Sequence, residues 1–262
     1  MSCVPIDRGA HFGARWPIDL CLNGSSEILF ATISYCAMKK KNTKEKQYQF
    51  MLDRRLARLG LMSSQVYQDD PRRLGFLLAR YKFVAKMFSG MNRVLEVGCA
   101  DAFGTRVVRQ EVPEVVAVDF DPIFIRDAKE CQDDKFPIEL RVCDLLKGPV
   151  EKGGFDGVYC CDVLEHIVPK VEEVFVGNLV QSLRPHGVLI IGSPSFESQL
   201  YASPPSKAGH VNCKRALELK ALMQKFFHNV FIFSMNDEIV HTGFYPMAHY
   251  LFALSCSPRA RR

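Results

Sequence analysis

The 262-residue chain lacks any apolar run long enough to cross a membrane. A membrane-spanning helix needs about 20 predominantly apolar residues, and the nearest candidate, residues 28–38, is too short and contains Thr32 and Ser34. A secretory signal is also missing, because acidic residues such as Asp7 and Glu27 interrupt the first segment of the chain. We therefore expect a soluble, cytoplasmic protein.

Cysteine pairs with C-x-x-C spacing are missing as well. The ten cysteines run from Cys3 to Cys256 with no C-x-x-C pair and no repeated spacing. This distribution favours a reduced compartment over a secreted disulfide scaffold. Cys99, Cys143 and Cys160 lie in apolar, strand-like runs, where a thiol behaves as a small buried hydrophobe.

The net charge is only +5, and the basic excess lies in the N-terminal third. Residues 1–90 contain 15 Lys and Arg against 7 Asp and Glu, whereas residues 91–262 contain 19 against 22. A lysine run between Lys39 and Lys46 suits contact with nucleic acid or an anionic surface, although a solvated linker is the simpler interpretation. Because no helical or strand period is sustained over residues 1–65, we expect a poorly ordered N-terminal extension there.

Residues 66–262 have the pattern of one α/β domain. An amphipathic helix is predicted to begin at Asp70-Pro71 and to end near Gly90. Beyond it, short β-branched runs alternate with helical periods, which is typical of a parallel sheet built from strand–helix–strand units. The expected strands are residues 93–97, 115–119, 138–143, 155–161 and 187–192, and the expected helices are residues 103–110, 122–132, 169–183 and 214–227.

The C-terminal end breaks this alternation. Residues 230–235 and 250–256 are both strand-like, and no helical period separates them. We expect these two runs to pair antiparallel at one edge of the sheet.

The most informative segment is residues 94–105, an apolar strand that leads into a turn of small residues and then a helix. In open α/β sheets the ligand crevice lies at the carboxyl ends of the strands, and a turn without large side chains lets backbone amides approach a ligand. Residues 98–104 are therefore expected to form the binding loop. The loop is not a phosphate loop, since no Gly-Lys-Ser/Thr follows, and Gly98 and Gly104 do not fit the G-x-G-x-x-G pattern.

Acidic residues stand near the ends of three successive predicted strands. They are Glu96 in the first, Asp119 at the end of the second and Asp144 at the end of the third. A carboxylate at the tip of the second strand can accept both hydroxyls of a ribose, and one at the next tip can accept the exocyclic amine of adenine. Together with the small-residue loop, these acids indicate an adenosine-type ligand.

These motifs resemble those of the class I S-adenosylmethionine-dependent methyltransferases. Residues 94–104 resemble the family's E/D-x-G-x-G-x-G motif, residues 155–166 its segment after the fourth strand, and residues 183–190 the segment leading into its fifth strand. The resemblance covers about residues 75 to 256 and implies a Rossmann-like, seven-stranded, mostly parallel sheet with an antiparallel C-terminal hairpin and helices on both faces. Ala100 and Ala102 stand where glycine is commoner, and both are small enough to keep the loop close to a cofactor.

The resemblance implies S-adenosyl-L-methionine as the cofactor. Eight residues are then expected to contact it: Glu96, Gly98, Ala100, Asp119, Phe120, Asp144, Leu145 and Cys161. Glu96, Gly98 and Ala100 would surround the methionine moiety, and Asp119 and Phe120 would contact the ribose and the adenine face. Asp144 and Leu145 would lie at the adenine edge, and Cys161 near the sulfonium. The alternative for Glu96 is a strand carboxylate satisfied by a neighbouring backbone amide.

Methyl transfer is an in-line displacement at a carbon already activated by the sulfonium, so at most one general base is required. The candidates are His166, Glu165 and His210. The segment Asp162-x-x-Glu165-His166 resembles the E-x-x-E-H motif of ubiquinone-type O-methyltransferases and small-RNA 2′-O-methyltransferases, where it serves a divalent metal. Many family members with a similar L-E-H segment bind no metal, so a Mg²⁺ or Mn²⁺ site is the less favoured alternative, and a packing and capping histidine is another for His166.

Other acceptor chemistries lack their motifs. At the end of the fourth strand the chain has Cys161-Asp162-Val163. DNA amino-methyltransferases have an Asn/Asp/Ser-Pro-Pro-aromatic motif there, and cytosine-C5 enzymes have a Pro-Cys nucleophile. Residues 193–212 are expected to form a substrate lid. The favoured function is O-methylation of a small-molecule hydroxyl. The alternatives are an RNA methyltransferase that uses the basic N-terminal third, and a methyltransferase-like protein that binds without catalysis.

Overall fold

The computed structural model describes residues 43–53 and 56–260 of the chain. Its contacts divide the chain into two units, residues 1–55 and 56–262. The described part of the first unit forms a short 3-10 helix, Lys46–Tyr48, and helix α1, Gln49–Asp53. Residues 1–42, most of the predicted extension, lie outside the described residues. The second unit begins at Leu56, ahead of the boundary expected at residue 66.

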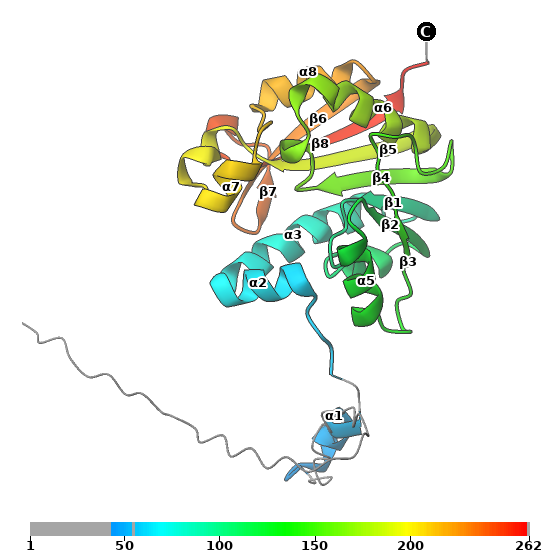
Figure 1. The fold of residues 1–262 in the computed structure, drawn as a ribbon, viewed down its shortest axis with the longest axis vertical. Helices are drawn as coiled ribbons and strands as arrows, with labels where there is room; N and C mark the ends of the chain where they lie inside the picture. The colour runs from blue at the N-terminus through cyan, green and yellow to red at the C-terminus, as the bar shows by residue number, and fades with distance from the viewer. Residues whose placement is uncertain (1–42, 54–55, 261–262) are drawn as a thin grey trace, which may run out of the picture. The chain divides into compact units, whose positions relative to one another are not determined.

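The second unit is built on one eight-stranded sheet with the strand order β3-β2-β1-β4-β5-β8-β6-β7 (Figure 1). The strands are β1 (Arg93–Val97), β2 (Glu114–Asp119), β3 (Glu139–Val142), β4 (Phe155–Cys161), β5 (Leu183–Pro194), β6 (Phe227–Asn236), β7 (Ile239–His241) and β8 (Tyr250–Pro258). Neighbours among β1 to β5 pair in parallel, and β8 pairs antiparallel with both β5 and β6. The parallel core and the antiparallel C-terminal strands confirm the predicted fold class.

The strand count differs from the prediction by one. Residues 239–241 form β7, which pairs antiparallel with the end of β6 across a turn at Asp237 with a φ of 50°. The sequence pattern did not indicate this strand, because three residues are too few to establish an alternation of polar and apolar side chains. The expected pairing of the two longer C-terminal runs is confirmed, with Val230 opposite Ser255.

Helices cover both faces of the sheet (Figure 1). They are α2 (Leu61–Asp69), α3 (Arg72–Met87), α4 (Thr105–Arg109), α5 (Pro122–Cys131), α6 (Glu172–Ser182), α7 (Pro204–Gly209) and α8 (Ala216–Gln224). Successive residues of β1 point to opposite faces, so Val94 packs with side chains from α3, α4 and α5, whereas Leu95 packs with side chains from α6 and α8. No helix among the described residues is both long and apolar enough to span a membrane.

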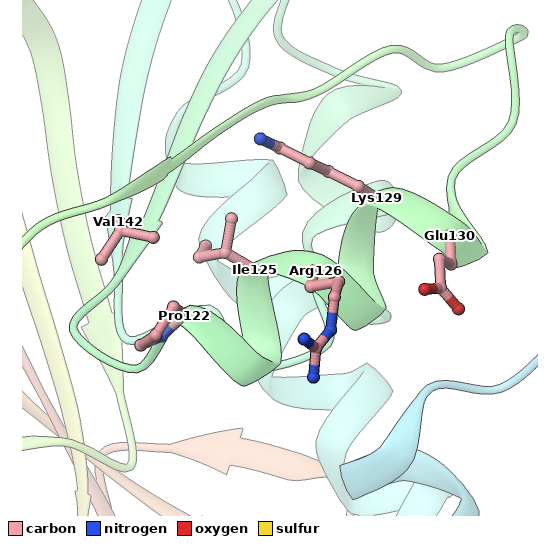
Figure 2. A pocket seen from close by; sticks show the side chains of 6 residues that line it. All are labelled: Pro122, Ile125, Arg126, Lys129, Glu130 and Val142. Atoms are coloured by element: carbon pink, nitrogen blue, oxygen red, sulfur yellow. The ribbon is translucent and has the colours of Figure 1, made fainter.

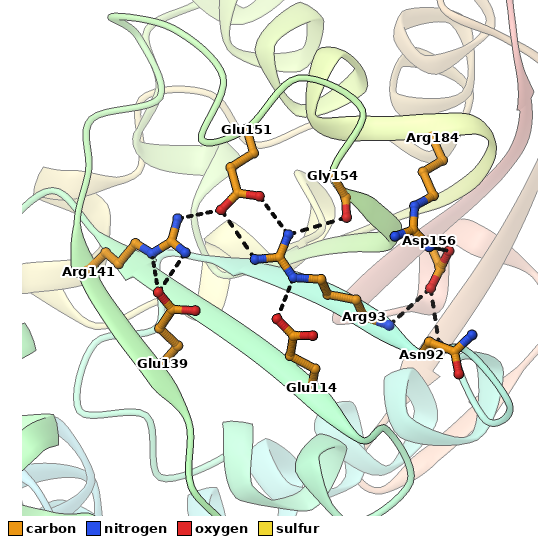
Figure 3. Close-up of polar contacts among 9 residues, drawn as sticks. All are labelled: Asn92, Arg93, Glu114, Glu139, Arg141, Glu151, Gly154, Asp156 and Arg184. Carbon is orange, nitrogen blue, oxygen red and sulfur yellow. Dashed lines mark hydrogen bonds and ion pairs between the residues drawn. The ribbon is translucent and has the colours of Figure 1, made fainter.

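Ion pairs join the amino ends of the parallel strands (Figure 3). Arg93, at the start of β1, donates to Glu151 with an Nη1–Oε2 distance of 2.6 Å and also pairs with Glu114 of β2. Arg141 of β3 donates to the same Glu151 at 2.6 Å. These two guanidinium groups lower the pKa of Glu151 to about 2. This network lies at the ends of the strands opposite the small-residue turn. It therefore stabilises the sheet and takes no part in a site at the turn.

Candidate active site

The turn of small residues that follows β1 has three residues in the left-handed region. Gly98, Ala100 and Ala102 have φ angles of 78°, 46° and 55°. A Cβ atom at position 98 would also collide with the Val163 side chain, so that position requires glycine. Alanine in the left-handed region costs about 1–2 kcal/mol per residue, so contacts from elsewhere must hold the turn.

Asp119, at the end of β2, is one of those contacts. Its Oδ2 accepts the Ala100 amide at 3.0 Å, and its Oδ1 accepts the Asp121 amide at 2.9 Å. The amides of Gly98 and Cys99 donate to the Val118 carbonyl at 2.8 and 3.1 Å. Each Asp119 oxygen retains a second lone pair. The residue therefore organises the turn, and its contact with a ribose stays a prediction.

Glu96 lies in a closed network between β1 and α3. It is 1% exposed, its Oε1 accepts the Tyr81 hydroxyl at 2.6 Å, and its Oε2 accepts the hydroxyls of Tyr159, at 2.8 Å, and Thr105. Burial raises the pKa of Glu96, while these three donors oppose the rise. Three hydroxyl groups thus occupy the carboxylate in this conformation, and its contact with a methionine moiety stays a prediction. Its partners are hydroxyls rather than the backbone amide of the alternative interpretation.

The other predicted cofactor residues lie along the ends of β2, β3 and β4. Phe120 is 73% exposed, which leaves its ring face open to a planar group. Asp144 accepts the Leu146 amide at 3.0 Å and pairs with Lys147. The Leu145 side chain is buried in the core, and the position of this residue at the adenine edge stays a prediction. Cys161, at the end of β4, is also buried.

The three predicted catalytic residues converge beyond the ends of β4 and β5. Glu165, His166 and His210 each offer a ligand atom, and these atoms lie within 4.8 Å of one another. Glu165 and His166 belong to the 3-10 helix Leu164–His166, and His210 follows α7. The amides of Val211 and Asn212 donate to the Glu165 carbonyl at 2.8 and 3.0 Å. These backbone bonds hold the two segments together.

Both imidazole rings are held through their Nδ1 atoms. The Nδ1 of His166 lies 3.0 Å from the Gly209 carbonyl, and that of His210 lies 2.8 Å from Oε1 of Gln199. Because both partners are oxygen acceptors, each neutral ring carries its proton on Nδ1 and keeps a lone pair on Nε2. Burial and the neighbouring His166 lower the pKa of His210. The His210 ring is therefore neutral at pH 7, with Nε2 free to accept a proton.

Glu165 is a buried carboxyl group with an unused oxygen. It is 1% exposed, its Oε2 accepts the Ser193 hydroxyl at 3.3 Å, and its Oε1 has no hydrogen-bond partner. Burial and the nearby Asp162 raise its pKa to about 8. Buried polar atoms nearly always have a partner in folded proteins. Oε1 is therefore available to a proton, a ligand or a cation.

Asp162 does not join this cluster, although it begins the predicted motif. It has a φ of 59°, and its Oδ2 accepts Nη1 of Arg80 at 2.6 Å. The Arg80 guanidinium lies 3.9 Å from the centre of the Tyr250 ring. Sequence reasoning missed Arg80 and Tyr250, because one lies in an ordinary amphipathic helix and the other in the last strand, with no motif around either. Arg80 Nε and the Tyr250 hydroxyl are also buried without partners.

The donor set of the cluster fits a divalent cation. Two imidazoles and one carboxylate suit Zn²⁺, Mn²⁺ or Fe²⁺ better than Mg²⁺, which prefers oxygen ligands. A hydrogen bond from the second ring nitrogen to an oxygen is the usual arrangement for metal-binding histidines, and both His166 and His210 have one. The same cluster can instead act as a proton acceptor.

A surface hollow of about 430 Å³ lies beside α5 (Figure 2). It is lined by Pro122, Ile125, Arg126, Lys129, Glu130 and Val142. These residues come from α5 and the edge strand β3, and none of the predicted site residues lines it. The hollow is therefore separate from the cluster at the ends of β4 and β5.

Comparison with known proteins identifies the family. Residues 95–191 match the family model of the methyltransferase domain, a segment that begins in β1 and ends in β5. The chain carries a methyltransferase domain over this segment, and it is similar there to S-adenosylmethionine-dependent methyltransferases. The resemblance seen in the sequence motifs is thus confirmed.

The methyltransferase domain has curated and structural relatives. A probable S-adenosylmethionine-dependent methyltransferase of Mycolicibacterium smegmatis is 25% identical over 149 residues, which cover 55% of this chain and 54% of that protein. The chain therefore matches about half the length of this relative. The N-methyltransferase NodS from Bradyrhizobium japonicum, solved with S-adenosyl-L-homocysteine, has a TM-score of 0.54 at 20% identity. The alignment covers 73% of this chain and 93% of the NodS chain.

A second solved structure is the methyltransferase in a Haloferax volcanii complex with the Trm112 methyltransferase activator. It has a TM-score of 0.58 at 13% identity, over 74% of this chain and 97% of the other. At such identities these likenesses establish the fold of the methyltransferase domain and leave its acceptor open.

Proposed function

We propose that the protein transfers the methyl group of S-adenosyl-L-methionine to a hydroxyl group of a small molecule. The convergence of Glu165, His166 and His210 beside the end of β4 is the observation that carries this proposal. A hydroxyl is a weak nucleophile until its proton is removed or polarised. Two imidazoles and a buried carboxyl group supply the means to do so.

In the proposed complex the cofactor lies across the ends of β1, β2 and β3. The backbone of Gly98 and Ala100 lies against the methionine moiety, and the free lone pairs of Asp119 accept the ribose hydroxyls. Phe120 contacts the adenine ring and Asp144 its exocyclic amine. The sheet order supports this layout, since β3, β2 and β1 are consecutive neighbours. The acceptor then lies on the other side, over β4 and β5.

His210 is the preferred general base, with His166 as the second candidate. Its pKa lies below the ordinary histidine value, so the ring is neutral at pH 7 and Nε2 can accept the hydroxyl proton. Glu165, with a pKa of about 8, holds a proton at neutral pH and can hydrogen-bond the acceptor oxygen. If Glu165, His166 and His210 hold a divalent cation, that cation supplies Lewis-acid activation of the hydroxyl.

The decisive experiment is calorimetric titration of S-adenosyl-L-homocysteine into the full chain and into Asp119→Ala. We expect micromolar binding to the wild type and a loss of more than about tenfold in the variant, because the ribose partner and the anchor of the turn are both removed. Asp134→Ala, an exposed acid on the surface, is the matched control. Absence of binding to the wild type would favour the non-catalytic alternative.

A screen with labelled S-adenosyl-L-methionine then identifies the acceptor. Catechols and sugar hydroxyls are the first candidates, each tested with and without Mn²⁺ and Zn²⁺. Incorporation of label into an RNA mixture, falling steeply with salt, would instead support the RNA alternative. Most of the lysine run on which that alternative rests lies outside the described residues.

A further inference from the structure

The binding turn is held from a segment that precedes the matched domain. We propose that Gly60 and Ser63 are positioning residues that clamp Asp101 and thereby keep the strained turn in its cofactor-binding conformation. This inference rests on the proposed cofactor site at residues 98–102. It assigns a role in binding to α2, which lies outside residues 95–191.

The clamp consists of two hydrogen bonds to one buried carboxylate. The Ser63 amide donates to Asp101 Oδ2 at 2.6 Å, and the Ser63 hydroxyl donates to Oδ1 at 3.1 Å. Both residues are buried, with exposures of 1% for Ser63 and 6% for Asp101. Amides in the first turn of a helix lack intrahelical partners, so Asp101 serves as a cap from a distant part of the chain.

Glycine at position 60 is required by this contact and not by its own backbone. Gly60 has a φ of −75°, which any residue adopts. A Cβ atom there would lie 2.7 Å from Asp101 Oδ2 and closer still to its carbon atoms. The absent side chain therefore makes room for the Asp101 carboxylate against the start of α2.

A second bond fastens the same helix end to the other wall of the crevice. The Leu61 amide donates to Asp127 Oδ2 at 2.6 Å, and Asp127 belongs to α5, the helix that follows Asp119 and Phe120. The first turn of α2 thus bridges the turn after β1 and the helix after β2. These two segments flank the proposed cofactor.

The turn needs such a clamp because alanine occupies two left-handed positions. Ala100 and Ala102 flank Asp101, with φ angles of 46° and 55°. Asp119 holds the turn from the β2 side through the Ala100 amide, and Ser63 holds it from the opposite side through Asp101. Glycine would adopt the same angles without steric cost. A turn with glycine at both positions would therefore depend less on the clamp.

The test compares the clamp variants in two backgrounds by calorimetric titration of S-adenosyl-L-homocysteine into the full chain. In the natural background we expect Ser63→Ala to weaken binding about fivefold, as for loss of one hydrogen bond, and Gly60→Ala to weaken it more. In an Ala100→Gly/Ala102→Gly background we expect the same substitutions to weaken binding less than about twofold, because glycine adopts these positive φ angles without steric strain. Ser64→Ala is the matched control, because its hydroxyl donates to the Leu59 carbonyl and not to Asp101.

A second ligand separates positioning from general stability. 5′-Methylthioadenosine lacks the amino-acid end of the cofactor, which the turn is proposed to contact, so Ser63→Ala should weaken its binding less than that of S-adenosyl-L-homocysteine. Equal binding of wild type and Ser63→Ala would overturn the clamp, as would an equal loss in both backgrounds. If the wild type binds neither ligand, the proposed function fails instead. Should Gly60→Ala not fold, Ser63→Ala and its control decide the question.

Discussion

Glu165 has the most unusual environment among the described site residues. A carboxyl group that is 1% exposed, with one oxygen unpartnered, resists ionisation, and its pKa rises to about 8. The unfolded chain ionises the same group near its ordinary value. Between these two pKa values the folded state binds more protons than the unfolded state, so this group makes stability fall as pH rises.

Glu165→Gln should remove that dependence. At pH 5 the variant and the wild type should have similar free energies of unfolding, because the carboxyl group is protonated in the folded state. As the pH rises to 8 the variant should gain relative to the wild type by roughly 1 kcal/mol per pH unit. Urea denaturation at both pH values measures the difference. Parallel stability curves would show that Glu165 ionises normally, or that another group compensates its charge.

His210→Gln should separate binding from chemistry. We expect S-adenosyl-L-homocysteine to bind within about twofold of the wild type, since His210 lies on the proposed acceptor side, and methyl transfer to fall about 100-fold or more, as for loss of a general base. Transfer by the wild type should rise with pH through a value below the ordinary histidine pKa and then level off. His228→Gln, an exposed histidine on β6, is the control. Unchanged transfer in His210→Gln would point to His166 as the base.

At the scale of elements, the two ends of the parallel strands do different work. The carboxyl ends of β1, β2 and β4 lead into the turn, the Asp119 segment and the 3-10 helix with Glu165 and His166. The amino ends are joined by the ion pairs of Arg93, Arg141 and Glu151 (Figure 3). Loss of an ion pair at the amino ends is therefore expected to change stability and not ligand binding.

Glu151→Gln tests this separation. Its pKa of about 2 in the folded protein lies below the ordinary value, so its contribution to stability is present above pH 4.5 and is lost as the pH falls towards 2. Because Glu151 is partly exposed, we expect a loss of about 1 kcal/mol at pH 7. Urea denaturation should show the difference between variant and wild type shrinking below pH 4. Affinity for S-adenosyl-L-homocysteine should not change, and a clear loss would contradict the separation.

At the scale of the whole molecule, the matched domain holds only part of the site. Residues 95–191 contain the turn, Asp119, Asp144 and Glu165, whereas Ser63 and Arg80 precede this segment and His210 follows it. The cofactor half of the proposed site thus lies in the shared domain. The clamp and much of the acceptor side come from segments outside residues 95–191, so we expect acceptor specificity to reside there.

The local elements followed directly from the sequence. The bounds of β1 and β4 agree with the predicted strands at residues 93–97 and 155–161, because buried parallel strands are mostly apolar. The start of α3 after Pro71 was also anticipated, since proline favours the first position of a helix. These features depend on neighbours along the chain.

The sequence by itself determined the strand–helix alternation, the small-residue turn and the acidic residues at the strand ends, because periodicity and turn chemistry act over a few residues. Only the tertiary structure decided which side chains meet. It placed Tyr81 on Glu96, Arg80 on Asp162 and Ser63 on Asp101, and it left Glu165 Oε1 without a partner beside two histidines. Such contacts join residues far apart along the chain, so they follow from how α2 and α3 pack on the sheet and have no local pattern.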